Sequence, residues 1–234
     1  MNILYIDQYA GSPSLGMEYR PFFLAREWGR MGHRTLIVAG DRSHLRRRQP
    51  MPGYHREEGV DFLFLPTRPY ADNGAGRMLN VLSFMAALRG IEGAAVRGFR
   101  PHVVLASSTH PFDGPAAWRI ARQSGARLVW ELHDLWPMTQ RLLWGMPAIH
   151  PFVLLTARRE RFLLDRADAV ASILPGGGRY LSERGQGNKP WLWLPNGVTE
   201  ESAPAKGGPL AGQLEREKAR GKFLLLYAGG MERA

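Results

Sequence analysis

Polar side chains follow two stretches that are predicted to be buried strands, at the points where those strands end. His133 and Asp134 come directly after Arg127–Leu132, and the polar segment Ser107–His110 follows His102–Ala106. In an α/β protein, ligands bind in the crevice outside the carboxyl ends of the strands. His133 is therefore the first candidate for a catalytic residue.

A structural interpretation of the same residues stays open. Asp134 can cap a following helix that has Pro137 in its first turn, and His133 can bond a backbone carbonyl. Polar residues at two neighbouring strand ends nevertheless favour a site.

The loop Ser12–Gly16 is a candidate for binding phosphate, because it directly precedes a predicted helix. Free amides and the helix dipole at such a position attract anions, and glycine permits a close approach of the backbone. Arg20, one turn into the helix, could add positive charge. Turning and capping alone would also explain glycine and serine in such a loop.

Two further segments have a plain and a sharper interpretation. Pro175–Gly178 could hold an anion, but a flexible turn is the favoured interpretation. The basic cluster Arg42, Arg46, Arg47 and Arg48 fits a solvated loop, and attraction to a membrane or polyanion is the alternative.

Several well-known signatures are absent from the sequence. No G-x-G-x-x-G follows a predicted strand, no G-x-S-x-G elbow occurs, and no H-E-x-x-H occurs. Gly11 and Gly16 have the spacing of a phosphate-binding P-loop, but Met17 and Glu18 replace its Lys-Ser/Thr pair. The seven His residues do not show the spacing of metal ligands, and the absence of Cys excludes disulfides and thiolate chemistry.

The charge balance favours partners that carry negative charge. The formal net charge is +10, and only four of the 31 basic residues are Lys, the rest being Arg. Phosphate ligands, anionic membrane surfaces and nucleic acids all suit such a balance, although no nucleic-acid recognition motif accompanies it. No signal peptide and no apolar stretch of ~18 residues is present, so we expect a soluble or peripheral protein.

Alternating strands and helices predict a doubly wound α/β fold with a mostly parallel sheet. Predicted strands are Asn2–Asp7, Arg34–Ala39, Val60–Leu65, His102–Ala106, Arg127–Leu132, Ala169–Leu174 and Trp191–Leu194. Predicted helices are Met17–Met31, Arg77–Arg97, Gly114–Ser124, Pro151–Asp165 and a short one that ends at Arg184.

The composition changes near residue 198. We expect one Rossmann-like domain over 1–198, a linker over 199–221 with a polar helix at Leu210–Arg220, and the start of a second domain over 222–234. Phe223–Tyr227 is predicted to be that domain's first strand, with the remainder missing.

Five segments together resemble the amino-terminal domain of family 4 glycosyltransferases, which have the GT-B fold, especially bacterial enzymes of surface-polysaccharide synthesis. These segments are Ser14–Arg20, Ala25–Trp28, Gly32–His33, Glu131–Pro137 and Leu194–Val198. The resemblance implies a Rossmann-like half of a two-domain enzyme, with helices on both faces of the sheet. It also implies transfer with retention, from a nucleotide-sugar to a lipid-linked or saccharide acceptor, without a cofactor or metal.

The resemblance also implies roles for particular residues. His133 would lie beside the transferred sugar and orient it, and the loop with Ser14 and Gly16, together with Arg20, would face the donor phosphates. Expected to line the acceptor side of the cleft are Glu18, Thr109, His110, Asp134 and Asn196.

The family's donor motif, two glutamates separated by seven residues, does not occur in the sequence. We therefore expect an acceptor-binding half that is inactive alone and lies in the cytoplasm, either free or peripherally at the inner face of the cell membrane. The alternative is a non-catalytic module that binds anionic lipid, a polyanion or a partner protein, and binding of nucleic acid is the least expected.

Overall fold

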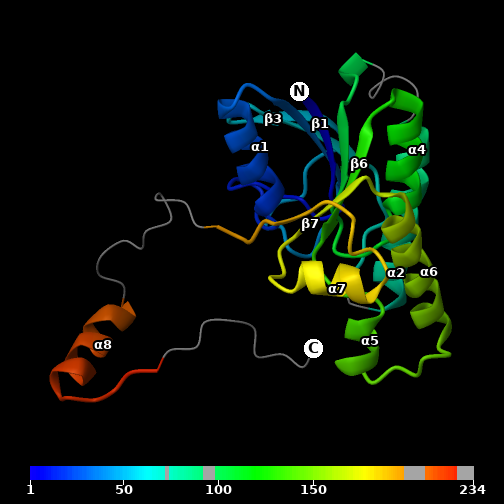
Figure 1. Cartoon of the computed structure of the whole chain (residues 1–234). Coiled ribbons are helices and arrows are strands. Elements are labelled where there is room, and N and C mark those ends of the chain that lie inside the picture. Colours follow the sequence, from blue (N-terminus) through cyan, green and yellow to red (C-terminus); the bar gives the residue numbers. More distant parts are fainter. Residues whose placement is uncertain (72–73, 92–97, 198–208, 226–234) are drawn as a thin grey trace. The chain divides into compact units, whose positions relative to one another are not determined.

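The computed structural model describes residues 1–71, 74–91, 98–197 and 209–225 (Figure 1). The chain forms two compact units, Met1–Pro195 and Asn196–Ala234.

The first unit contains an eight-stranded sheet in the order β3-β4-β2-β1-β5-β6-β7-β8. All neighbouring pairs are parallel except the antiparallel pair β3 and β4. The strands are β1 Asn2–Ile6, β2 Arg34–Gly40, β3 Gly53–Glu57, β4 Val60–Leu65, β5 Val103–Ala106, β6 Arg127–Leu132, β7 Ala169–Ser172 and β8 Trp191–Trp193. The predicted mostly parallel α/β sheet is thereby confirmed.

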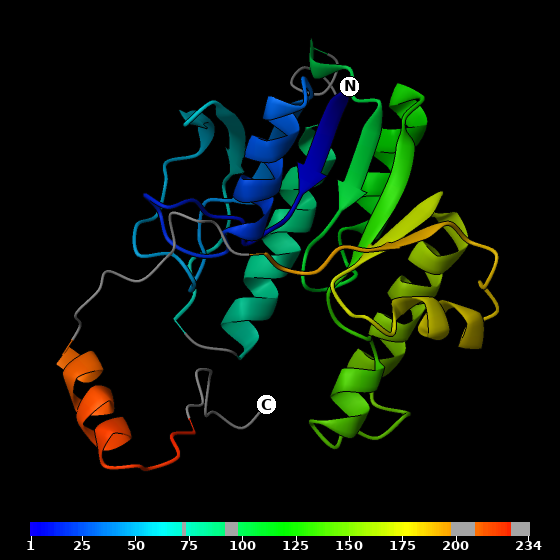
Figure 2. The same cartoon turned by 60° about the vertical axis from the view of Figure 1, so that its left-hand side comes forward.

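Helices cover both faces of this sheet. Side chains alternate along each strand, so Leu4 and Ile6 of β1 face one core and Tyr5 faces the other. Helices α2, α4, α6 and α7 pack on the first face and α1 packs on the second (Figures 1 and 2). The helices of this unit are α1 Arg20–Arg30, α2 Ala75–Gly90, α4 Gly114–Ser124, α5 Met138–Leu142, α6 Pro151–Arg166 and α7 Gly177–Glu183.

The structure adds two elements that the sequence patterns do not predict. Strand β3 lies in a segment for which neither a strand nor a helix is predicted. Its residues are polar and mostly exposed, and its pairing with β4 holds it in place. Helix α5 is only five residues long, which is too short for a helical repeat of apolar residues to be visible.

Two predicted helices have different limits in the structure. Helix α1 begins at Arg20 rather than Met17, because the backbone of Glu18 bonds to Gly11 and Tyr9 instead of a helical turn. Helix α2 covers Ala75–Gly90, and residues 92–97 of the predicted helix lie outside the described residues.

The second unit contains helix α8, Pro209–Ala219, close to the predicted polar helix. The described part of the predicted strand Phe223–Tyr227, residues 223–225, is not in a strand. Phe223 and Leu225 are almost fully exposed, so their apolar side chains have no packing partners that would favour an extended strand. Residues 226–227 lie outside the described part.

Among the described residues, no helix combines the length and apolar character that crossing a membrane requires.

Candidate functional site

The candidate site lies where the strand order reverses direction, between β1 and β5. The chain leaves β1 at Asp7 and Gln8 and leaves β5 at Ser107 and Ser108. The Gln8 amide donates a hydrogen bond of 3.1 Å to Ser108 Oγ, which joins the two loops. The carboxyl ends of strands at such a switch point form the ligand-binding crevice of open α/β sheets.

His133 follows the neighbouring strand β6 and reaches this point. Its Nε2 lies 3.0 Å from Ser107 Oγ and 3.3 Å from Glu131 Oε2, and its side chain is 11% exposed. The structure therefore brings together the two polar strand ends that the sequence singles out.

Glu131 is the centre of this arrangement, and the sequence analysis did not assign it to the site. Its buried carboxylate accepts hydrogen bonds from Tyr5 Oη at 2.6 Å, from Ser107 Oγ and from Arg20. Burial alone would raise the pKa of Glu131, but the hydrogen bonds and charges of His133 and Arg20 lower it to about 2. The signal that could have found it is a charged residue inside an apolar strand, because buried charges need partners.

The ionised Glu131 sets the charge of His133 in turn. Burial acts to lower the pKa of His133, but the hydrogen bond and charge of Glu131 and the charge of Asp7 outweigh it, so the pKa is raised above 6.5. The imidazolium form is thus more favoured for His133 than for a free histidine side chain.

Arg20 lies in the first turn of α1 and spans three parts of the unit. Its Nη2 donates to Glu131 Oε1 at 2.7 Å, and its Nη1 and Nη2 donate to the carbonyls of Pro195 and Leu194 at 3.0 and 2.7 Å. In this structure Arg20 holds α1, β6 and the segment after β8 together. The predicted contact between Arg20 and a donor phosphate stays a prediction.

The loop that contains Ser14 donates hydrogen bonds to a carboxylate side chain of the same protein, that of Glu57. The Ser14 amide and hydroxyl donate to the Glu57 carboxylate at 3.1 and 2.7 Å, and Ser12 Oγ donates to it at 2.5 Å. A phosphate that used the Ser14 donors would have to displace Glu57. The predicted phosphate contact of Ser14 remains untested.

Gly16 is required by the packing of this loop. Its φ is +113°, and a Cβ at this position would lie 2.6 Å from the Arg47 backbone nitrogen. Arg46, next to it, is buried and donates to the carbonyls of Ala10 and Gly40. The interpretation of the whole Arg42–Arg48 cluster as a solvated loop is therefore wrong for Arg46, which anchors the segment internally.

His110 lies beside the switch point, with Nε2 2.7 Å from Gln8 Oε1. Burial lowers its pKa to about 4, so the ring is neutral at physiological pH. Its Nδ1 has no hydrogen-bond partner within the described residues. Asp7, which the sequence analysis missed, has an equally unpartnered Oδ2 there, and burial raises its pKa to about 7.

The other predicted cleft residues make local contacts. Glu18 Oε1 accepts from the Arg20 amide at 3.3 Å, and the Thr109 carbonyl accepts from Trp136 Nε1 at 2.8 Å. The pKa of Asp134 is raised by burial, against the charge of His133. Asn196 belongs to the second compact unit. None of these contacts tests the predicted roles.

The family of the chain follows from its similarity to a known domain. The model of the Glycosyl transferase 4-like domain matches residues 16–197. The chain belongs to this family. No curated protein matches the sequence at a significant level.

Solved structures show the same fold in this glycosyl transferase 4-like domain. Sucrose-phosphate synthase from Thermosynechococcus elongatus has a TM-score of 0.59 at 12% identity, over 85% of this chain and 49% of that one. Phytolacca americana UGT2, complexed with UDP-2fluoro-glucose and pterostilbene, has a TM-score of 0.54 at 13% identity, over 94% of this chain and 63% of that one. Arabidopsis thaliana UGT89C1, complexed with UDP-L-rhamnose, has a TM-score of 0.52 at 13% identity, over 89% of this chain and 55% of that one.

These likenesses show a fold like that of one half of a GT-B glycosyltransferase. The match to the family model, and not these structures, confirms the prediction of a glycosyltransferase family. The glycosyl transferase 4-like chain spans about half to two thirds of the length of these three structures.

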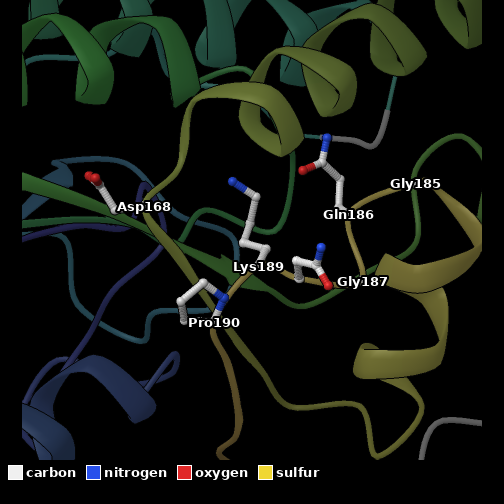
Figure 3. Close-up of a pocket in the computed structure, with 7 residues that line it drawn as sticks. Asp168, Gly185, Gln186, Gly187, Lys189 and Pro190 are labelled. Atoms are coloured by element: carbon white, nitrogen blue, oxygen red, sulfur yellow. The ribbon is translucent and has the colours of Figure 1, made fainter.

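A pocket of about 500 Å³ lies elsewhere on the domain (Figure 3). It is lined by residues just before β7 and β8, including Asp168 and Lys189, and so lies at the amino ends of the strands. The Lys189 amine donates to the Ala167 carbonyl. This pocket lies at the amino ends of the strands, whereas His133 lies at their carboxyl ends, and none of the predicted site residues lines it.

Within the described ranges, no group of three or more acidic or His side chains is arranged to hold a metal ion.

Proposed function

We propose that this chain forms the acceptor side of a retaining glycosyltransferase, which transfers a sugar from a nucleotide-sugar to a lipid-linked or polysaccharide acceptor. The observation that carries the proposal is the position of His133, which Ser107 and Glu131 hold at the switch point of the sheet. The nucleotide-sugar bound in the Phytolacca americana structure supports this class of donor.

His133 would act by orienting the sugar and stabilising charge. Because Nε2 faces the ionised Glu131, the proton on that nitrogen is held there, and Nδ1 is the nitrogen that can meet a sugar hydroxyl. An imidazolium also stabilises negative charge that develops as the donor phosphate leaves. His133 is thus an orienting and electrostatic group and not a nucleophile.

The proposed reaction also needs a domain that binds the nucleotide-sugar donor. The two-glutamate motif expected for that domain is absent from these 234 residues, so we propose that turnover requires such a domain in addition. The resemblance to bacterial polysaccharide enzymes supports a reaction in the cytoplasm, at the inner face of the cell membrane. It also supports direct transfer without a cofactor or a bound metal.

A reconstitution experiment tests this function. Residues 1–197 are joined to the donor domain of a family relative, and labelled nucleotide-sugars are offered with lipid and saccharide acceptors. Incorporation of sugar with retained anomeric configuration is expected for the joined protein and not for the chain alone. Turnover by the chain alone would contradict the half-site proposal, and no turnover with any donor and acceptor would contradict the proposed function.

A further inference from the structure

The segment from α5 to the first turns of α6 exposes a set of large apolar side chains. We call residues 141–155 the tip. Both views show α5 and the connection to α6 at the end of the first unit that is opposite the start of β1 (Figures 1 and 2). The exposed apolar side chains of the tip are Ile149 at 83%, Leu142 at 74%, Leu143 at 62%, Leu154 at 56%, Trp144 at 44% and Leu155 at 42%.

Internal contacts hold the tip in this conformation. The buried Thr156 hydroxyl donates to Gln140 Oε1 at 2.7 Å, which joins α5 to α6, and the Met146 amide donates to the Gln140 carbonyl at 3.1 Å. The ring of Trp144 packs edge-on against Trp136, with 6.0 Å between the centroids. The apolar side chains are therefore presented outward by a bonded scaffold.

The charged residues within the tip and its immediate flanks in the chain are all basic, up to Asp134 on one side and the buried Glu160 on the other. Residues 135–159 include Arg141, Arg158 and Arg159 and no acidic residue. Arg158 lies one turn after Leu154 on the exposed face of α6, while Arg141 directly precedes the exposed Leu142. Exposed apolar side chains with Arg next to them in the chain suit a bilayer surface, which has an apolar acyl boundary and anionic headgroups.

We propose that the tip is a docking site for an anionic lipid bilayer, with its apolar side chains in the headgroup boundary and its Arg side chains against the lipid phosphates. The combination of exposed Leu, Ile and Trp side chains with Arg and no acidic residue is the pattern of membrane-surface segments, and it favours an anionic lipid surface over a protein partner. This surface differs from the Arg42–Arg48 segment, in which the sequence suggested membrane attraction.

The location of the tip links this contact to the site. Strand β6 leads into His133, and eight residues later the chain reaches Arg141, so the tip follows the crevice directly in the chain. A bilayer at the tip would lie at the carboxyl-end side of the sheet, where a lipid-linked acceptor would enter. This purpose rests on the proposed function, whereas the docking itself is independent of any sugar transfer.

Vesicle co-sedimentation of the full chain, without donor or acceptor, tests the docking. We expect binding to vesicles of phosphatidylcholine mixed with phosphatidylglycerol, and little to phosphatidylcholine alone. The pair Leu142→Ser and Ile149→Ser should weaken this binding by about tenfold or more, because both side chains would lose their burial in lipid. Arg141→Glu should weaken it by about tenfold, and added salt should reduce what the Arg side chains contribute.

Matched variants far from the tip serve as controls. Met31 is 72% exposed at the end of α1, beside the amino end of β2, so Met31→Ser removes a similar exposed apolar side chain. Arg30→Glu makes the same charge change as Arg141→Glu. Both controls should bind vesicles like the unchanged chain.

Three results would overturn the proposal: no binding to anionic vesicles, equal binding by the tip variants and controls, or a dimer that light scattering shows to dissociate in the tip variants. In the last case the tip is a contact between copies. Failed sugar transfer with intact vesicle binding contradicts only the proposed function, and the reverse result contradicts only the docking.

Discussion

Arg20 and Glu131 form a buried ion pair across the sheet face, with 2.7 Å between Nη2 and Oε1 and side-chain exposures of 6% and 0%. The two residues are 111 positions apart in the sequence. Their pairing helps keep Glu131 ionised beside His133, which follows two residues later, and it fixes α1 against β6. The charge state of His133 therefore depends on a contact made by a helix on one face of the sheet.

Replacing Arg20 by Ala should destabilise the domain strongly. Glu131 would keep its buried charge but lose its cationic partner, which typically costs about 3 to 5 kcal/mol. Denaturant unfolding of the variant measures this loss. Arg30→Ala is the control, because Arg30 pairs with Glu27 at the surface, and a surface pair contributes only about 0 to 1 kcal/mol. Equal effects of the two changes would contradict the structural role assigned to Arg20.

Asp7 should make the domain less stable as the pH rises towards 8. Burial raises its pKa from 3.8 to about 7 in the folded state. A carboxyl with a raised folded-state pKa contributes stability that is fully present below about pH 4 and is lost as the pH rises through about 7. Asp7→Asn should therefore gain on the order of 2 to 4 kcal/mol over the unchanged chain at pH 8, relative to their difference at pH 4. Parallel unfolding curves at both pH values measure this, and a pH-independent difference would contradict it.

Gly16→Ala should destabilise the loop that precedes α1. A methyl group there meets the Arg47 backbone, and φ of +113° is unfavourable for any residue with a Cβ. Gly29→Ala is the matched control, because Gly29 lies within α1 with nothing within 4 Å of an added Cβ. That change should stabilise α1 by roughly 0.5 to 1 kcal/mol. Thermal unfolding should show shifts of opposite sign, and shifts of the same sign would contradict the packing seen at Gly16.

The sheet could be predicted from the sequence because most of its strands have a local sequence pattern. Seven of the eight strands are apolar stretches followed by turns or polar residues, and parallel strands bring such ends to one edge. This is also why His133 and Ser107 could be placed together. Strand β3 escaped prediction because its residues are exposed and polar, and only pairing with β4 makes it a strand.

The network behind His133 could not be predicted from local patterns. Glu131 is the one buried charge in a mostly apolar strand, and its partners Tyr5, Arg20 and Ser107 are distant in the sequence. Arg46 likewise belongs to a basic run that looks solvated, yet it is buried against two carbonyls. Such contacts are set by the tertiary structure, and one sequence contains no direct signal for them.

His133→Ala, made in the joined two-domain protein, should lower turnover by about 100-fold or more while the fold is kept, because an electrostatic group at the reacting centre is lost. The fold should survive, since Glu131 keeps Arg20, Tyr5 and Ser107 as partners.

The variant Glu131→Gln tests the charge next to His133 while a side chain of the same size is kept. It should lower the pKa of His133, because the hydrogen bond and charge of Glu131 raise that pKa. Turnover that depends on the imidazolium should therefore begin to fall at a lower pH as the pH is raised. Circular dichroism and an NMR titration of His133 accompany the assay. An unfolded His133→Ala variant, or a folded one with full turnover, would show that His133 has a structural role instead.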